Sequence, residues 1–157
     1  MTPKTQLLIS FAAAASLVGT AIAAPPPQAG RKLSAVLNGA NECDASGTCN
    51  LGDPDGTGTA NITVNVGQQR VCWKITTSNL STITRAHIHK APAGIAGPIV
   101  VGFFEANEVR LDGCTPTTQP LDRRLLQDII QHPQAYYVNV HTVDFPNGAI
   151  RGQLSKK

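Results

Sequence analysis

Two histidines separated by one residue are the most concentrated chemical signal in this chain of 157 residues. They stand in the segment 86–89, Ala-His-Ile-His, and because successive side chains of a β-strand point to opposite faces, His87 and His89 would share one face. A third histidine, His141, lies in another alternating segment, with Asn139 two residues before it on the same face. If the two segments are neighbours in a sheet, three imidazoles converge, and three imidazoles are a usual ligand set for copper or zinc.

The same histidines could instead be architectural. A pair with the spacing H-x-H is short enough to arise without any metal. Imidazoles that face one another can also hydrogen-bond to Asp144, Asn139 or backbone groups and close the open end of a β-sandwich. The sequence leaves both interpretations open and favours the architectural one, with copper or zinc at His87, His89 and His141 as the alternative.

No pattern typical of hydrolytic catalysis accompanies these histidines. None of the serines lies in a G-x-S-x-G elbow, which would present an activated nucleophile. Glu105 and Glu108 follow a predicted strand, but nothing in the sequence indicates a pocket that would separate their pKa values. We therefore expect that the protein is not an enzyme.

The first residues predict export. Lys4 precedes an apolar run from Leu7 to Val18, and Ala21-Ile22-Ala23 fits the A-x-A rule for signal-peptide cleavage. The run is too short to span a bilayer, so we expect a signal peptide over residues 1–23, no membrane span, and a secreted or periplasmic mature protein. A proline-rich linker is expected over residues 24–31. The net charge of +3 is too small and too dispersed to predict nucleic-acid binding.

An even number of cysteines in an exported chain normally means disulfides. Three pairings of Cys43, Cys49, Cys72 and Cys114 are possible. We favour Cys43–Cys49 with Cys72–Cys114, because the first pair flanks a short polar turn, residues 44–48, that brings its ends together at little cost.

The elements that must position these residues are short strands within one domain, residues 32–155. Segments in which apolar and polar residues alternate are separated by clusters of Gly, Pro, Asn and Asp, which is typical of an all-β sandwich or barrel. One segment instead repeats its apolar residues every three or four positions and predicts a short amphipathic helix near 121–131, beginning near Pro120 and ending before Pro133. The expected strands cover about 32–38, 60–66, 71–76, 82–89, 98–104, 136–141 and 149–154, followed by a solvated tail.

Two blocks of sequence resemble the CHRD family, the domain that is repeated in chordin. The block 86–101 is similar to the family's A-H-I-H-x-G-P-A-G-x-x-G-P-V-V-V, and the block 137–154 to its Y-V-N-V-H-T and F-P-x-G-E-I-R-G-Q-L stretches. Leu37-Asn38-Gly39-Ala40 looks like the family's opening. The resemblance implies an immunoglobulin-like β-sandwich or barrel, placement outside the cytoplasm, and a binding role without a settled activity. Ala149 stands where the family often has Glu, which removes one acidic candidate near Arg151.

Arg151 is expected near His141, where its guanidinium group could donate hydrogen bonds to loop carbonyls or to a ligand, and a structural role is favoured. Taken together, the sequence predicts an exported binding or structural module with an extracellular protein or matrix partner. The alternative is a copper or zinc protein with a three-histidine site, resembling Cu/Zn superoxide dismutase in its exported β-sandwich and its H-x-H pair.

Overall fold

The computed structural model describes residues 29–157. The predicted signal peptide, residues 1–23, and most of the predicted linker lie outside the described residues. The strands are β1 (Arg31–Asn38), β2 (Thr57–Asn65), β3 (Arg70–Ser78), β4 (Ile83–Lys90), β5 (Ile99–Phe104), β6 (Asp112–Cys114), β7 (Tyr136–Thr142), β8 (Ile150–Gln153) and β9 (Ser155–Lys156). The helices are α1 (Arg123–Gln131) and two short 3₁₀ turns, Gly39–Asn41 and Pro133–Ala135.

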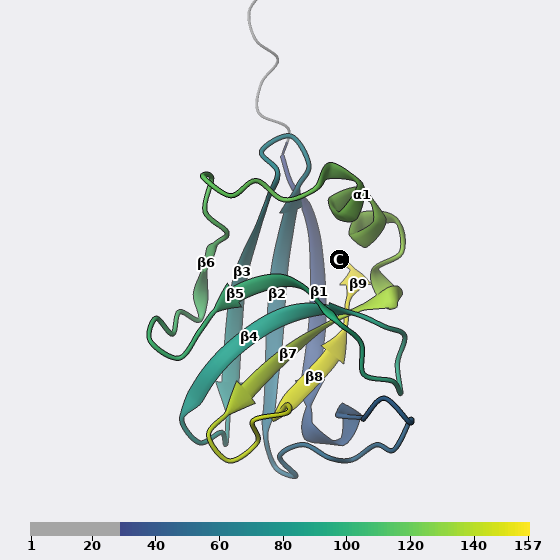
Figure 1. Cartoon of the computed structure of the whole chain (residues 1–157), viewed down its shortest axis with the longest axis vertical. Helices are drawn as coiled ribbons and strands as arrows, with labels where there is room; N and C mark the ends of the chain where they lie inside the picture. Colours follow the sequence, from purple (N-terminus) through teal and green to yellow (C-terminus); the bar gives the residue numbers. More distant parts are fainter. Residues whose placement is uncertain (1–28) are drawn as a thin grey trace, which may run out of the picture.

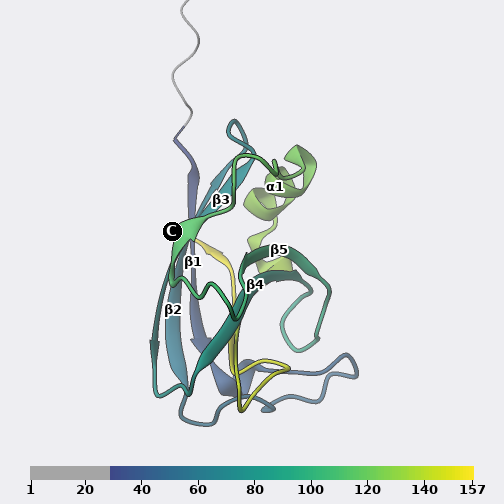
Figure 2. The same ribbon diagram turned by 60° about the vertical axis from the view of Figure 1, so that its left-hand side comes forward.

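All strands belong to one antiparallel sheet that is nearly closed into a barrel. The strand order is β5-β4-β7-β8-β1-β2-β3-β6, with β9 paired to β1. In Figure 1 the long strands β1 to β3 run nearly vertically and β4, β7 and β8 cross them obliquely, and Figure 2 shows the two groups of strands facing each other. Trp73 of β3 stacks on Phe103 of β5 with ring centroids 4.6 Å apart, so the core is continuous between the two ends of the sheet. The predicted all-β fold is confirmed.

Period-two alternation explains which side chains fill the barrel. On β1, β2 and β3 every second residue is apolar and buried, while its neighbours remain partly or fully exposed. Because side chains of a strand alternate between faces, each of these strands has one face in the core and one in solvent. Large core residues include Leu33, Leu37, Ile62, Trp73, Ile75, Ile88, Val138, Val140 and Ile150.

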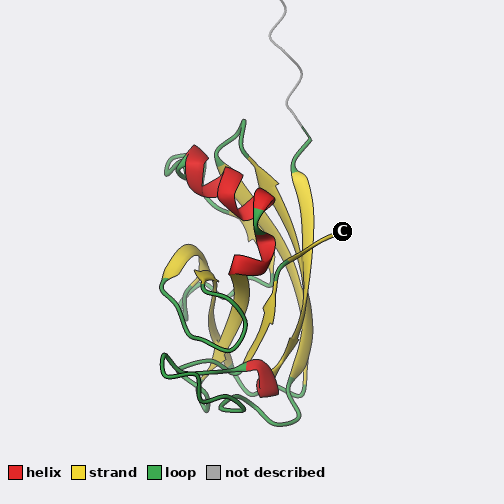
Figure 3. Cartoon of the chain, turned by 90° about the vertical axis from the view of Figure 1, so that its right-hand side faces the viewer, coloured by secondary structure: helices red, strands yellow, loops and turns green. Residues whose placement is uncertain are grey.

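Strand β7 differs because every one of its residues is buried. Its apolar side chains, such as Val138 and Val140, point into the core. The opposite face of β7 carries polar side chains and is covered by two loops, residues 42–56 and 91–98. Asn139 contacts the first loop through Glu42. The hydroxyl of Tyr137 contacts the second loop through the N–H of Gly97. Figure 3 shows these loops lying outside the strand layer. The alternation therefore creates a second, polar buried layer outside the core.

Both predicted disulfides are present. Cys43 is bonded to Cys49, and Cys72 of β3 is bonded to Cys114 of β6, its register partner. The three-residue strand β6 was not predicted, because it is too short to show alternation. The segment Ser155–Lys156 was predicted to be a solvated tail; its residues are exposed, but they form strand β9 and pair with β1.

The predicted helix exists but begins later than expected. It starts at Arg123 rather than near Pro120, because the Asp122 side chain caps it by accepting a hydrogen bond from the Arg124 N–H. Asp128 on this helix accepts hydrogen bonds from Lys90 and the Tyr136 hydroxyl, which tie the helix to β4 and β7, and another from His132 at the end of the helix. Among the described residues, no helix is long and apolar enough to cross a membrane.

Candidate metal centre

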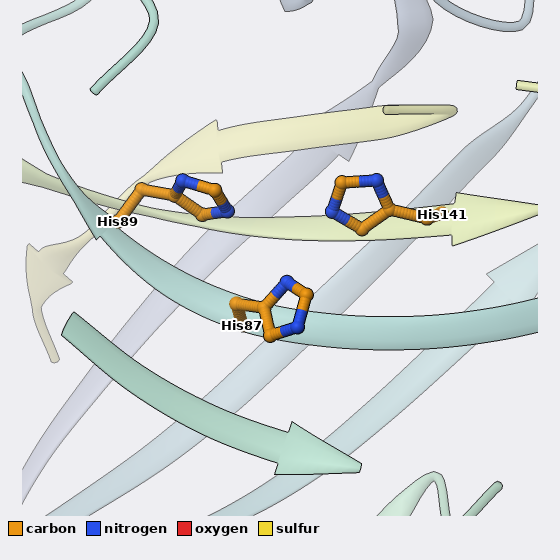
Figure 4. Close-up of side chains that lie close together, drawn as sticks. All are labelled: His87, His89 and His141. Carbon is orange, nitrogen blue, oxygen red and sulfur yellow. The ribbon is translucent and has the colours of Figure 1, made fainter. Parts of the chain in front are cut away.

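The pairing of β4 with β7 brings the three predicted histidines together. In this register His87 lies opposite Asn139, and His89 lies opposite Tyr137. Because Tyr137, Asn139 and His141 alternate along β7, all these side chains lie on the same outer face of the sheet. One nitrogen atom from each of the three imidazoles lies within 4.8 Å of the other two. Figure 4 shows the three rings turned toward a common centre.

The outward nitrogen of each imidazole is held by an oxygen atom. His89 Nδ1 lies 2.9 Å from the carbonyl oxygen of Gly97, and His141 Nδ1 lies 3.1 Å from the carbonyl oxygen of Pro146. His87 Nε2 lies 3.1 Å from a carboxylate oxygen of Glu105. Carbonyl and carboxylate oxygens accept hydrogen bonds, so these nitrogens carry the protons, and a neutral ring in this orientation has its bare nitrogen on the other side.

The bare nitrogens point inward and lack partners. His87 Nδ1, His89 Nε2 and His141 Nε2 are buried and have no hydrogen-bond partner among the described residues. Metal-binding histidines characteristically donate their second N–H to a carbonyl or carboxylate, which fixes the tautomer and the ring orientation. With ligand bonds of about 2.0–2.1 Å, a tetrahedral ion would hold three nitrogens about 3.4 Å apart. Ring rotations that moved each of these nitrogens about 1 Å toward the centre would reach that spacing. The donor set therefore fits copper or zinc.

Burial favours the neutral, ligand form of two of these imidazoles. Burial lowers the pKa of His141 to about 4, and the nearby His87 ring adds to the shift. Burial also lowers the pKa of His89, although its hydrogen bond to Gly97 works in the opposite direction. Near neutral pH these rings are therefore uncharged and able to coordinate a metal.

The predicted hydrogen bonds to side chains of Asp144 and Asn139 are not the ones that hold the imidazoles. The backbone, which was also among the predicted partners, holds His89 and His141 through carbonyl oxygens, and Glu105, which was not among them, holds His87. The sequence indicates no pocket around Glu105, and its contact with His87 depends on how β5 ends beside β4. Glu108, which follows the same strand, lies elsewhere and pairs with Arg110 at 3.5 Å.

Arg151 lies beside the histidine cluster rather than against His141. Its register partner on β7 is Asn139. The guanidinium group donates hydrogen bonds to the carbonyl oxygens of Ile95 and Pro92, at 3.1 and 3.4 Å, and so fastens the loop 91–98 over the polar face. The predicted donation to loop carbonyls is therefore present.

Glu42 is a buried residue of the site that the sequence did not indicate. It is only 4% exposed, and its Oε2 atom accepts a hydrogen bond of 3.4 Å from the amide of Asn139. Burial raises its pKa to about 8, while the positive charge of Arg151 and the Asn139 amide act in the opposite direction. Glu42 stands in an irregular loop next to Cys43, where no spacing pattern marks it.

The sequence model of the CHRD domain matches residues 33–154, which is most of the chain. The chain belongs to the CHRD family. No curated protein and no solved structure matches it. The histidine pair and His141 both lie inside the matched region, so the candidate centre is part of the CHRD domain itself.

Next to Ala149, the last hairpin of this CHRD domain lies against an acidic side chain. Ala149 is fully buried next to Gly148, and a carbon atom added at Gly148 would lie 2.6 Å from the Glu42 carboxylate. An acidic side chain from the loop thus occupies the space beside the last hairpin and acts electrostatically on Arg151.

Proposed function

We propose that this protein is an exported CHRD-domain binding module that holds one copper or zinc ion on His87, His89 and His141. The observation that carries the proposal is the set of three buried imidazole nitrogens that face one another without hydrogen-bond partners among the described residues. The opposite nitrogen of each ring is fixed by an oxygen atom. Three bare nitrogen lone pairs in one buried place repel one another, and a cation relieves that repulsion.

Two further features support an exported binding protein. Two disulfides are typical of proteins outside the reducing cytoplasm, in agreement with the predicted signal peptide and a secreted or periplasmic location. Each of the three imidazoles is less than a tenth exposed, which suits the retention of an ion better than the turnover of a substrate. A role in binding rather than catalysis is therefore part of the proposal, while an extracellular protein or matrix partner stays a prediction.

The test is a titration of the tag-free protein, with both disulfides oxidised, by Cu(II) and by Zn(II) in separate calorimetric experiments. We expect one equivalent of metal to bind, and at a free-metal concentration of about 100 times the dissociation constant we expect stabilisation of about 2.7 kcal/mol. The double variant His87→Ala/His89→Ala should lose stoichiometric binding.

His132→Ala is the matched control, because His132 is exposed at the end of α1 and is held by Asp128 away from the cluster. This variant should bind like the wild type. The proposal fails if the wild-type protein binds neither ion, or if the double variant binds as tightly as the control.

A further inference from the structure

Asn139 occupies the middle of the face that carries the three imidazoles. Two residues before it, the Tyr137 ring stacks on His89 with centroids 4.8 Å apart, and two residues after it stands His141. Its register partner on β4 is His87. In Figure 4, β7 passes behind the gap between the rings of His89 and His141. The Asn139 side chain therefore starts from the strand position between the two outer imidazoles and beside the third.

The orientation of the Asn139 amide is set by Glu42. The Nδ2 atom donates a hydrogen bond to Glu42 Oε2, so the amide nitrogen faces the loop that carries Glu42. The oxygen atom Oδ1, on the other arm of the amide, is not the atom that contacts Glu42. Asn139 is only 3% exposed, and Oδ1 has no hydrogen-bond partner among the described residues. A buried carbonyl oxygen without a donor is costly and calls for an explanation.

Most of the buried atoms without partners among the described residues belong to this face. Of eight such buried side-chain atoms in residues 29–157, five belong to Glu42, His87, His89, Asn139 and His141. The three bare imidazole nitrogens and the Asn139 oxygen are all acceptors of hydrogen bonds. A bare metal ion would satisfy the nitrogens but leave the amide oxygen without a donor. A metal ion with a coordinated water molecule satisfies all four, because the water supplies O–H donors.

We propose that the metal centre keeps one coordination position for a water molecule, and that Asn139, oriented by Glu42, accepts a hydrogen bond from that water through Oδ1. This inference rests on the proposed function. Three protein ligands with a water in the fourth position make an open site, whereas structural sites are closed by four protein ligands. The open position can therefore exchange its water for a small anion. Asn139 acts as a positioning residue that favours water over such a competitor.

Azide is a suitable probe, since it binds Cu(II) in place of water, gives a charge-transfer absorption band, and has no hydrogen to donate to Asn139. We would load the wild-type protein, Asn139→Leu and Asn139→Asp with Cu(II), and titrate each with azide. Removing the acceptor in Asn139→Leu should tighten azide binding about three- to tenfold, the equivalent of one hydrogen bond to water. The carboxylate in Asn139→Asp holds the water more strongly and repels the anion, so it should weaken azide binding at least about tenfold.

Opposite shifts in the two variants would not arise from a merely structural role. Asn61→Leu, on the exposed face of β2, is the matched control and should bind azide like the wild type. If Asn139→Leu does not fold, the comparison of Asn139→Asp with the wild type still decides. A wild-type protein that binds Cu(II) but not azide, or equal azide affinities in the wild type and the Asn139 variants, would overturn this inference and leave the metal site standing. A wild-type protein that binds no Cu(II) would instead overturn the proposed function.

Discussion

The guanidinium carbon of Arg151 lies 3.7 Å from the centroid of the Tyr137 ring, on the polar face of the sheet. The Tyr137 ring has a second partner, because it also stacks on the His89 ring. Arg151, Tyr137 and His89 therefore form a continuous packed column from β8 across β7 to β4. The same guanidinium group fastens the loop 91–98, whose Gly97 carbonyl orients His89. Arg151 therefore contacts both the loop 91–98 and, through Tyr137, the histidine centre.

Replacing Arg151 by lysine should destabilise the fold by about 2–4 kcal/mol, because lysine keeps the charge but cannot stack flat on Tyr137 or bond two carbonyls at once. Urea unfolding followed by circular dichroism measures the change. Arg123→Lys, an exposed change on α1, should stay within about 0.5 kcal/mol of the wild type. Equal effects of the two changes would mean that the contacts of Arg151 contribute no stability.

Gly97→Ala should disturb the orientation of His89. An added carbon atom at Gly97 would lie 2.1 Å from the carbonyl oxygen of Lys90, so the loop would have to move, and the carbonyl that holds His89 Nδ1 would move with it. We expect metal affinity to fall about 10- to 100-fold, as for the loss of other groups that orient metal ligands. Gly102→Ala is the control, because nothing lies within 4 Å of its added carbon. Calorimetric titration compares the two, and equal affinities would contradict the assigned role of Gly97.

The two disulfides should separate stability from metal affinity. Breaking Cys72–Cys114 with a double serine variant should cost about 4 kcal/mol, and breaking Cys43–Cys49 about 2 kcal/mol, because the first closes the longer loop. Metal affinity should show the reverse order. The loop closed by the Cys43–Cys49 disulfide contacts the loop 91–98, because the Ala96 N–H donates a hydrogen bond to the carbonyl oxygen of Asp44. Denaturant unfolding and metal titration of both variants test this order. The prediction is wrong if the same variant shows the larger loss of stability and the larger loss of metal affinity.

The buried carboxyl of Glu42 should make the stability of the metal-free protein fall as the pH rises. Its folded pKa of about 8 lies above the value of 4.5 for an exposed carboxyl, so the folded state binds the extra proton between these values and loses stability across that range. Glu42→Gln removes this titration. The free energy of unfolding of the variant relative to wild type should therefore rise from pH 4.5 to pH 8, by an amount on the order of several kcal/mol.

Taking the difference between variant and wild type at each pH cancels the contributions of other groups. This matters because the lowered pKa of His141 acts in the opposite sense: it makes stability rise between about pH 4 and pH 6.5. Denaturant titrations at four or five pH values suffice. A difference that is constant with pH would show that Glu42 is ionised alike in the folded and unfolded chains.

The alternation of apolar and polar residues along the chain determined which side chains share a face and where most of the strands lie. It placed His87 and His89 on one face, put Asn139 and His141 on one face of another strand, and predicted most of the strands, because the side chains of an extended peptide must point alternately to opposite sides. The spacing of the cysteines favoured, among three possible pairings, the one that the structure contains, since the short polar turn between Cys43 and Cys49 brings their ends together.

Only the tertiary structure decided that β4 lies beside β7 in the register that joins the two histidine segments. It also brought Glu105 to His87, the loop carbonyls to His89 and His141, and Glu42 to Asn139. Glu42 and Asn139 are 97 residues apart, and the carbonyl partners of His89 and His141 stand in irregular loops without periodicity. Their positions follow from how the whole sheet buries its apolar face and closes on itself, which no local pattern of residues encodes.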